Sequence, residues 1–204
     1  MKINKDNIHE TKTLIINCAG ELIAKYGYAK VTSKSICEKA EVNIAAINYH
    51  FGSRDKLYVE VLREVHEYII NMNELNKLCS ANLSAKEKLE NFIDIFVENL
   101  LEKKKWYIKV WLREIVSSSP FISKILSQDT INKLDTISKI FSEYTGLSVA
   151  DPKLYSCILI VISPFFMYFL SHNIGEILPV KCNKEELIAH LKKFSFAGLD
   201  AFKK

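Results

Sequence analysis

The sequence is poor in glycine and proline, the residues that mark turns. Its 204 residues include six Gly and four Pro, and these stand singly between long stretches in which apolar residues recur with a helical spacing. A turn-rich β fold is therefore disfavoured. Because 49% of the residues are hydrophobic, the chain can build a proper core, and intrinsic disorder is not expected. We expect an all-α protein.

Features of secreted and membrane proteins are also missing. The five cysteines are odd in number and form no C-x-x-C pair, which favours reduced thiols. The polar start, MKINKDNIHETK, lacks the apolar segment of a signal peptide. The most apolar stretch, Cys157–Leu170, is shorter than the ~20 residues of a membrane span, and Ser163-Pro164 interrupts it. We expect a cytoplasmic protein that has no membrane partner and in which this stretch is a buried or interface helix.

Motifs of catalysis and of metal binding are absent. The sequence contains no G-x-G-x-x-G, P-loop, H-E-x-x-H or G-x-S-x-G motif, and its five histidines are dispersed. We therefore expect no enzymatic activity, no metal and no cofactor. The 28 Lys and Arg nearly balance the 24 Asp and Glu, and the net charge of +4 permits nucleic-acid binding without requiring it.

Apolar spacing and capping residues predict about nine helices, four of them before residue 80. The first three are predicted at Ile8–Tyr26, from Thr32 or Ser33 to Ala40, and at Ile44–His50 with Asn43 as N-cap. The fourth, capped by Ser53, should be long and reach about Leu78. Five more helices follow. Four of them have clear start signals: Ser84–Glu87, Ser119-Pro120, Asp151-Pro152 and Asn183–Glu186.

The most informative stretch is Thr32–Leu57, TSKSICEKAEVNIAAINYHFGSRDKL. Two short helices, a tight turn, apolar residues between them and a polar outer face on the second meet the requirements of a helix-turn-helix. The segment Ala40–Arg54 resembles the TetR/AcrR family of transcription regulators. The family pattern in this region is roughly alanine, glycine, valine and a small polar residue, followed by a segment that ends in tyrosine-x-histidine-phenylalanine, and then serine-lysine. Glu41, Asn48 and Arg54 stand where that family usually has glycine, tyrosine and lysine.

The resemblance implies a DNA-binding domain at residues 1–53 and a helical effector-binding and dimerisation domain at residues 54–204. Residues at the start of the second predicted helix should bind phosphate: Thr32, Ser33 and Lys34. Residues of the third should face base edges in the major groove: Asn43, Ala45, Ala46, Asn48 and Tyr49. The resemblance implies that His50 and Arg54 bind the DNA phosphate backbone beside these bases, and Lys56 could contribute to the same contact. The alternative is a purely structural role, in which the Ser, Thr and Asn residues are ordinary helix caps and His50 is a turn residue.

The later part of the chain, from Trp106-Tyr107 to Asp151-Pro152, is similar to the YbiH/CecR type of C-terminal domain. The family resemblance implies that the last two helices form the interface of a homodimer. A ligand cavity could be lined by Trp106, Trp111, Phe141, Tyr144, Tyr155, Phe165 and Tyr168, with Arg113, Glu114 or His172 as polar anchors. The same aromatic residues could instead be core, and Arg113-Glu114 could be a structural ion pair.

The sequence therefore predicts a TetR-type repressor that leaves a palindromic operator when a small-molecule effector binds. In this hypothesis effector binding moves the fourth helix, which joins the effector-binding domain to the DNA-binding domain. Two rivals remain open: a regulator that activates or that has no effector, and a helical ligand-binding or scaffold protein with a vestigial DNA-binding head.

Overall fold

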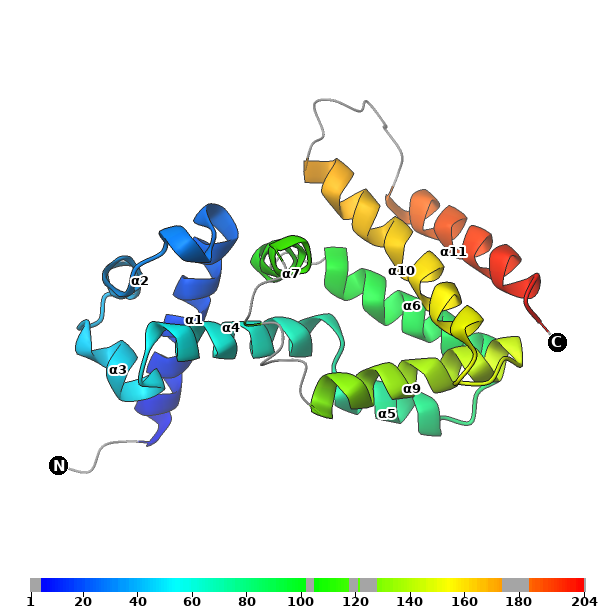
Figure 1. The fold of residues 1–204 in the computed structure, drawn as a ribbon, viewed down its shortest axis with the longest axis horizontal. Coiled ribbons are helices and arrows are strands. Elements are labelled where there is room, and N and C mark those ends of the chain that lie inside the picture. The colour runs from blue at the N-terminus through cyan, green and yellow to red at the C-terminus, as the bar shows by residue number, and fades with distance from the viewer. Residues whose placement is uncertain (1–4, 102–104, 118–120, 122–127, 174–183, 204) are drawn as a thin grey trace. The chain divides into compact units, whose positions relative to one another are not determined.

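The computed structural model describes residues 5–101, 105–117, 121, 128–173 and 184–203 (Figure 1). Throughout this part of the chain every regular element is helical, which confirms the all-α prediction. The helices form two compact units: residues 1–69 with 104–127, and residues 70–103 with 128–204. The first unit is thus larger than the DNA-binding domain predicted at residues 1–53, because it also contains α4 and α7.

The first unit is a bundle built around its first helix. Its elements are α1 (Lys5–Tyr26), η1 (Tyr28–Lys30), α2 (Ser33–Ala40), α3 (Ala45–Phe51), α4 (Arg54–Ile69) and α7 (Lys105–Ser117). Helix α1 contacts α2, α4 and α7, and α3 contacts α2 and α4. Apolar side chains from all of these α-helices are buried: Ile15, Ala19, Ile23, Ile36, Ile47, Leu57, Val61, Val65 and Val110.

The contact between α1 and α7 is close at two points. A Cβ added to Gly20 would lie 2.2 Å from the nearest ring atom of Trp106, so only glycine lets the indole approach the helix. Further along, Arg113 donates hydrogen bonds to the carbonyl oxygens of Ala24 (3.2 Å) and Lys25 (3.4 Å). The last carbonyls of a helix have no partner within it, so Arg113 caps the end of α1 from α7.

The second unit packs its apolar residues between three long helices. Its elements are α5 (Met72–Ser80), α6 (Ala85–Leu101), α9 (Gln128–Thr145), α10 (Pro152–Asn173) and α11 (Lys184–Asp200). Helix α10 contacts α6, α9 and α11, and α5 contacts α6 and α9. The core holds Leu89, Phe92, Phe96, Phe141 and Phe165. Two ion pairs tie helices together at its edge: Lys88–Glu143 (3.0 Å) and Lys192–Asp94 (2.5 Å).

The prediction of one long helix from Ser53 to Leu78 is wrong. Helix α4 ends at Ile69, and α5 begins at Met72 with Asn71 as its N-cap. The side-chain oxygen of Asn71 accepts hydrogen bonds from the backbone N–H groups of Asn73 (2.9 Å) and Glu74 (3.2 Å). Apolar spacing concealed the break, because both helices bury their apolar residues. The asparagine was the local signal that a new helix begins.

Two other predictions meet the structure differently. The predicted start at Ser119-Pro120 lies outside the described residues, and the next described helix begins at Gln128. The single helix predicted over Cys157–Leu170 is confirmed, because α10 runs through Pro164 as a continuous helix of 22 residues. Its segment Pro152–Phe169 is long and apolar enough to cross a membrane by length and composition, a test that core helices also pass.

The fit of Trp106 against Gly20 gives a stability prediction. Replacing glycine by alanine inside a helix ordinarily stabilises by about 0.5–1 kcal/mol. In Gly20→Ala the clash with the indole should outweigh this gain and lower the free energy of unfolding by about 1–2 kcal/mol, measured by urea denaturation. Gly198→Ala in α11 is the matched control, since an added Cβ there meets nothing within 4 Å. Equal effects of the two changes would contradict the proposed packing.

Candidate nucleic-acid interface

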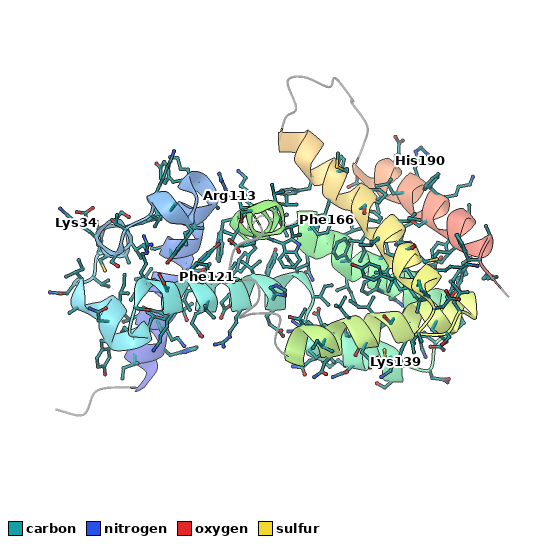
Figure 2. All side chains as sticks on the ribbon, in the orientation of Figure 1. Lys34, Arg113, Phe121, Lys139, Phe166 and His190 are labelled. Atoms are coloured by element: carbon teal, nitrogen blue, oxygen red, sulfur yellow. The ribbon has the colours of Figure 1, made fainter. Side chains whose placement is uncertain are left out.

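The start of α2 is held by a reciprocal cap. The Thr32 hydroxyl accepts a hydrogen bond from the backbone N–H of Ser35 (3.1 Å), and the Ser35 hydroxyl accepts one from the backbone N–H of Thr32 (3.1 Å). Ser33 and Lys34 lie in the first turn. The Lys34 side chain is 78% exposed on the outside of the helix (Figure 2), and its ion pair with exposed Glu38 spans 3.9 Å. Such a pair is weak, so the ammonium group is available to another anion.

The turn between α2 and α3 depends on a left-handed residue. Glu41 has φ 53° and ψ 38°, and it is the one non-glycine residue with positive φ in the described part of the chain. Beyond it, the N–H of Val42 donates to the carbonyl oxygen of Cys37 (3.0 Å), which closes α2. The left-handed conformation costs a side-chain-bearing residue about 1–2 kcal/mol. The glycine of the TetR pattern would adopt it without this cost.

Helix α3 begins one residue later than predicted. The side-chain oxygen of Asn43 accepts a hydrogen bond from the N–H of Ala45 (2.9 Å), and the backbone oxygen of Asn43 accepts one from Ala46 (2.8 Å). On the inner face Ile47 and Phe51 are 1% and 7% exposed. Gly52, with φ 78°, then ends the helix. The side chains that remain outside are therefore fixed by two buried anchors and two turns.

Most residues predicted to read bases lie on the outer face of this segment. Asn43, Ala45, Asn48 and Tyr49 are exposed, and Ala46 is half-buried. Sequence reasoning missed Ile44, which is 56% exposed and lies one helical turn before Asn48. An isoleucine three positions before Ile47 looks like a core residue, so only the start of α3 at Ala45 places it outside. The predicted phosphate ligands Thr32 and Lys56 are exposed, and Ser33 and His50 are half-buried.

Arg54 makes contacts within the protein that the sequence did not predict. Its Nη1 donates to the carbonyl oxygen of Val31 (2.6 Å), and its guanidinium carbon lies 4.4 Å from the centre of the Tyr28 ring. The Tyr28 hydroxyl donates to Asp55. Arg54 therefore joins the start of α4 to the residue that precedes the cap of α2. Its predicted role as a phosphate clamp stays a prediction.

A buried polar pair joins α4 to α7. Tyr58 is 2% exposed and Glu114 is 4% exposed, and the tyrosine hydroxyl donates to the carboxylate. Burial, and then this hydrogen bond, raise the pKa of Tyr58 above the usual value for tyrosine. The phenol therefore stays protonated and keeps donating. Arg113 caps the end of α1, and the alternative ion pair between Arg113 and Glu114 stays a prediction.

The residues predicted to line a ligand cavity fall in both units. Those of the first unit are Trp106, Trp111, Arg113 and Glu114, and those of the second are Phe141, Tyr144, Tyr155, Phe165 and Tyr168. The side chain of His172 lies outside the described residues. These residues stay predictions as ligand contacts.

Several of them have plain structural environments. Phe141 and Phe165 are 0% and 1% exposed and belong to the core, whereas Tyr155 is 59% exposed. The Tyr144 hydroxyl donates to Asp200 (2.7 Å). Trp111 is the exception, because its buried indole N–H has no hydrogen-bond acceptor among the described residues.

Comparison with protein families decides the identity of the two halves. Residues 15–61 match the tetR family of bacterial regulatory proteins, and residues 85–199 match the C-terminal domain of the HTH-type transcriptional dual regulator CecR. The chain belongs to the TetR family and has a CecR-type C-terminal domain. TetR-family proteins are DNA-binding transcription regulators and not enzymes, as predicted. No curated protein matches the sequence.

Solved structures of TetR-like regulators share the fold. A TetR-like regulator from Rhodococcus sp. RHA1 is 15% identical, with 93% of this chain and 95% of that chain covered and a TM-score of 0.70. A Clostridium perfringens protein, provisionally a fatty acid metabolism regulator, is 18% identical over 91% and 97%, with a TM-score of 0.72. The fatty acid degradation regulator FadR from Bacillus halodurans is 14% identical over 90% and 93%, with a TM-score of 0.67.

The strained turn before α3 gives a second stability prediction. Glu41→Gly should raise the free energy of unfolding by about 0.5–1 kcal/mol, since it removes the left-handed strain at some cost in chain entropy. Glu38→Gly, a change of the same kind three residues earlier within α2, should lower it by about 1 kcal/mol. Urea denaturation of both variants provides the comparison. A loss of stability in Glu41→Gly would rule out the strained turn.

Proposed function

We propose that this TetR-family regulator is a cytoplasmic homodimer that represses transcription from a palindromic operator and is released by a small-molecule ligand. The observation that carries the proposal is the outer face of α3. Two buried residues, Ile47 and Phe51, hold the helix, while Asn48 and Tyr49 project outward. A short helix held in this way is the reading element of a helix-turn-helix.

The exposed residues have the chemistry that base and phosphate contacts need. The Asn48 amide can pair with adenine through two hydrogen bonds, and Ala45 and Ile44 can contact the methyl group of thymine. Asn43 is a poorer candidate, because its side-chain oxygen already accepts a hydrogen bond from Ala45. Phosphate contacts are proposed for two groups of residues. These are Thr32, Ser33 and Lys34 at the start of α2, and His50, Arg54 and Lys56 around the start of α4.

Dimerisation through the last two helices is supported by their exposed apolar side chains. On α10 these residues follow one another at steps of four, one and seven, which places them within about 140° of the helix circumference: Tyr155, Leu159, Ile160 and Met167. On α11, Phe194 is 66% exposed. Exposed apolar side chains gathered on one side of a helix are often covered by a partner. A second copy would cover it, and a two-fold dimer suits a palindromic operator.

Release by a ligand would require a path from effector to DNA. Helix α4 belongs to the same compact unit as the helix-turn-helix, and it contacts α7 through Tyr58 and Glu114. A ligand that displaces α7 would therefore act on α4 directly. If ligand and DNA favour different positions of α4, each lowers the affinity of the other by the same factor.

Selection of bound sequences from random duplexes tests the proposal as a whole. We expect a palindrome to be recovered, and its affinity should fall steeply as salt rises, because phosphate contacts release counterions. If the DNA-binding domain were vestigial, no sequence would be selected even at low ionic strength. The position of the palindrome relative to a promoter separates repression from activation.

Asn48→Ala tests direct reading of bases. Loss of a two-bond contact should reduce the preference for operator over random DNA by about 5- to 150-fold, equivalent to about 1–3 kcal/mol. Binding to random DNA should hardly change, because phosphate contacts remain. Fluorescence anisotropy with both duplexes measures the ratio, and Asn76→Ala, an exposed asparagine of α5, is the control. An unchanged ratio would remove Asn48 from the base-reading set.

Leu159→Glu tests the dimer interface. Leu159 is 46% exposed on the apolar face of α10, so a carboxylate there would be buried without a partner in the dimer. We expect the variant to sediment as a monomer and to lose operator affinity. Ile131→Glu is the matched control, since Ile131 is a 56% exposed aliphatic residue of α9. A Leu159→Glu protein that remains dimeric would contradict this interface.

A further inference from the structure

The first unit contains a cavity that the sequence did not predict. Its volume is about 670 Å³, within the range of small-molecule sites. The end of α1, the short η1 segment, Tyr58 of α4 and one side of α7 form its walls. Of the residues predicted to bind ligand, the polar anchors Arg113 and Glu114 are among those that line it.

The walls of this cavity are mainly aromatic and aliphatic. The rings of Tyr28 and Tyr58 stack with centres 4.2 Å apart and planes 14° from parallel. Phe121 meets both edge-on, at 5.1 Å and 5.2 Å. Ile23 and Val116 add aliphatic surface. Such walls suit a ligand with a flat apolar body, which gains both burial and ring contacts.

The charged groups around the cavity favour a cation. Glu114 lines it and is 4% exposed, so its charge acts in a poorly screened environment. Lys30 and Arg113 also line the cavity, but both are exposed and therefore screened by water. Arg113 is moreover directed at two carbonyl oxygens of α1.

We propose that this cavity binds an organic ammonium ion with a flat apolar body. The ammonium group is held by the Glu114 carboxylate, and the apolar body lies against Ile23, Val116 and the ring edges of Tyr28, Tyr58 and Phe121. The location differs from the predicted ligand cavity, because the aromatic residues predicted to bind ligand do not line this one.

Occupancy of this site reaches the DNA-binding elements through Tyr28. The Tyr28 hydroxyl donates to Asp55, its ring lies under the Arg54 guanidinium, and Arg54 holds the carbonyl oxygen of Val31. Thr32, the cap of α2, follows directly. A ligand that shifts the stacked tyrosines therefore alters the starts of both α2 and α4. This coupling rests on the proposed DNA-binding function, whereas the binding site itself does not.

Three probes that share one ring system test the site. They are 1-naphthylmethylammonium, the neutral 1-naphthylmethanol and the anionic 1-naphthylacetate, titrated into the full chain without DNA by calorimetry. The ammonium ion should bind about tenfold or more tightly than the alcohol, and the acetate most weakly. Equal affinities, a reversed order, or no binding of the ammonium ion at millimolar concentration would overturn the proposal.

Two substitutions place the binding. Glu114→Gln should bring the affinity for the ammonium ion down to that for the alcohol. Because Glu114 is buried, Val116→Arg provides a second variant that should not disturb folding, since Val116 lines the cavity but is 84% exposed. It should weaken binding of the ammonium ion about tenfold relative to the alcohol. Val149→Arg, at a 52% exposed valine of the second unit, is the control. Unchanged binding by Val116→Arg, or an equal loss in the control, would overturn the assignment.

The coupling is measured with the selected operator. A saturating concentration of the ammonium ion should change operator affinity, and operator DNA should change affinity for the ammonium ion by the same factor. Unchanged operator affinity would overturn the coupling. Failure of the ligand-free protein to bind any duplex would instead count against the proposed function, and the calorimetric result would stand independently.

Discussion

A helix of seven residues has too few hydrogen bonds to persist in water by itself, so the outer face of α3 depends on the burial of its inner one. Ile47 and Phe51 provide this burial in the contacts that α3 makes with α2 and α4. The turns at Glu41 and Gly52 set where the helix begins and ends. Every residue proposed to read bases owes its position to these few constraints. Apolar packing on the inner face of α3 therefore fixes the positions of the outer side chains that are proposed to contact DNA.

Helix α7 extends the same unit far beyond the helix-turn-helix. It meets α1 through Trp106 and Arg113, and it meets α4 through Glu114. The Trp106 ring fills the space beside Gly20, and Arg113 donates to the free carbonyl oxygens at the end of α1. Glu114 accepts the hydrogen bond of the buried Tyr58 phenol. An element held in this way cannot shift without moving the helices that carry the DNA-binding residues. The cavity at this junction is for that reason a suitable place for regulation.

The last two helices, α10 and α11, expose apolar side chains that their own unit does not cover. In the apolar segment Pro152–Phe169 of α10, 33% of the residues are buried. Leu159 and Met167 lie on its exposed face, and Phe194 is exposed on α11. A membrane or a second copy could each cover such a face in principle. The membership of the chain in a family of DNA-binding regulators favours the second copy.

Features that depend on neighbours along the chain could be predicted from the amino-acid pattern. The all-α class, the helix-turn-helix and the caps Thr32 and Ser53 follow from spacing and from side chains that bond to the next turn. Family resemblance rested on the same contiguous run. Asn71 belonged to this local class too, but the continuous apolar pattern around it concealed the break.

The pairing of distant residues, in contrast, depends on how the helices pack. The hydrogen bond from Tyr58 to Glu114 joins positions 56 residues apart, and the bond from Arg113 to Ala24 joins positions 89 residues apart. The engagement of Arg54 with Val31 arises in the same way. Local patterns state which residues can be buried or charged, but the partner of each is chosen by the packing of whole helices. A cavity is a property of that packing, and no single segment of the sequence encodes it.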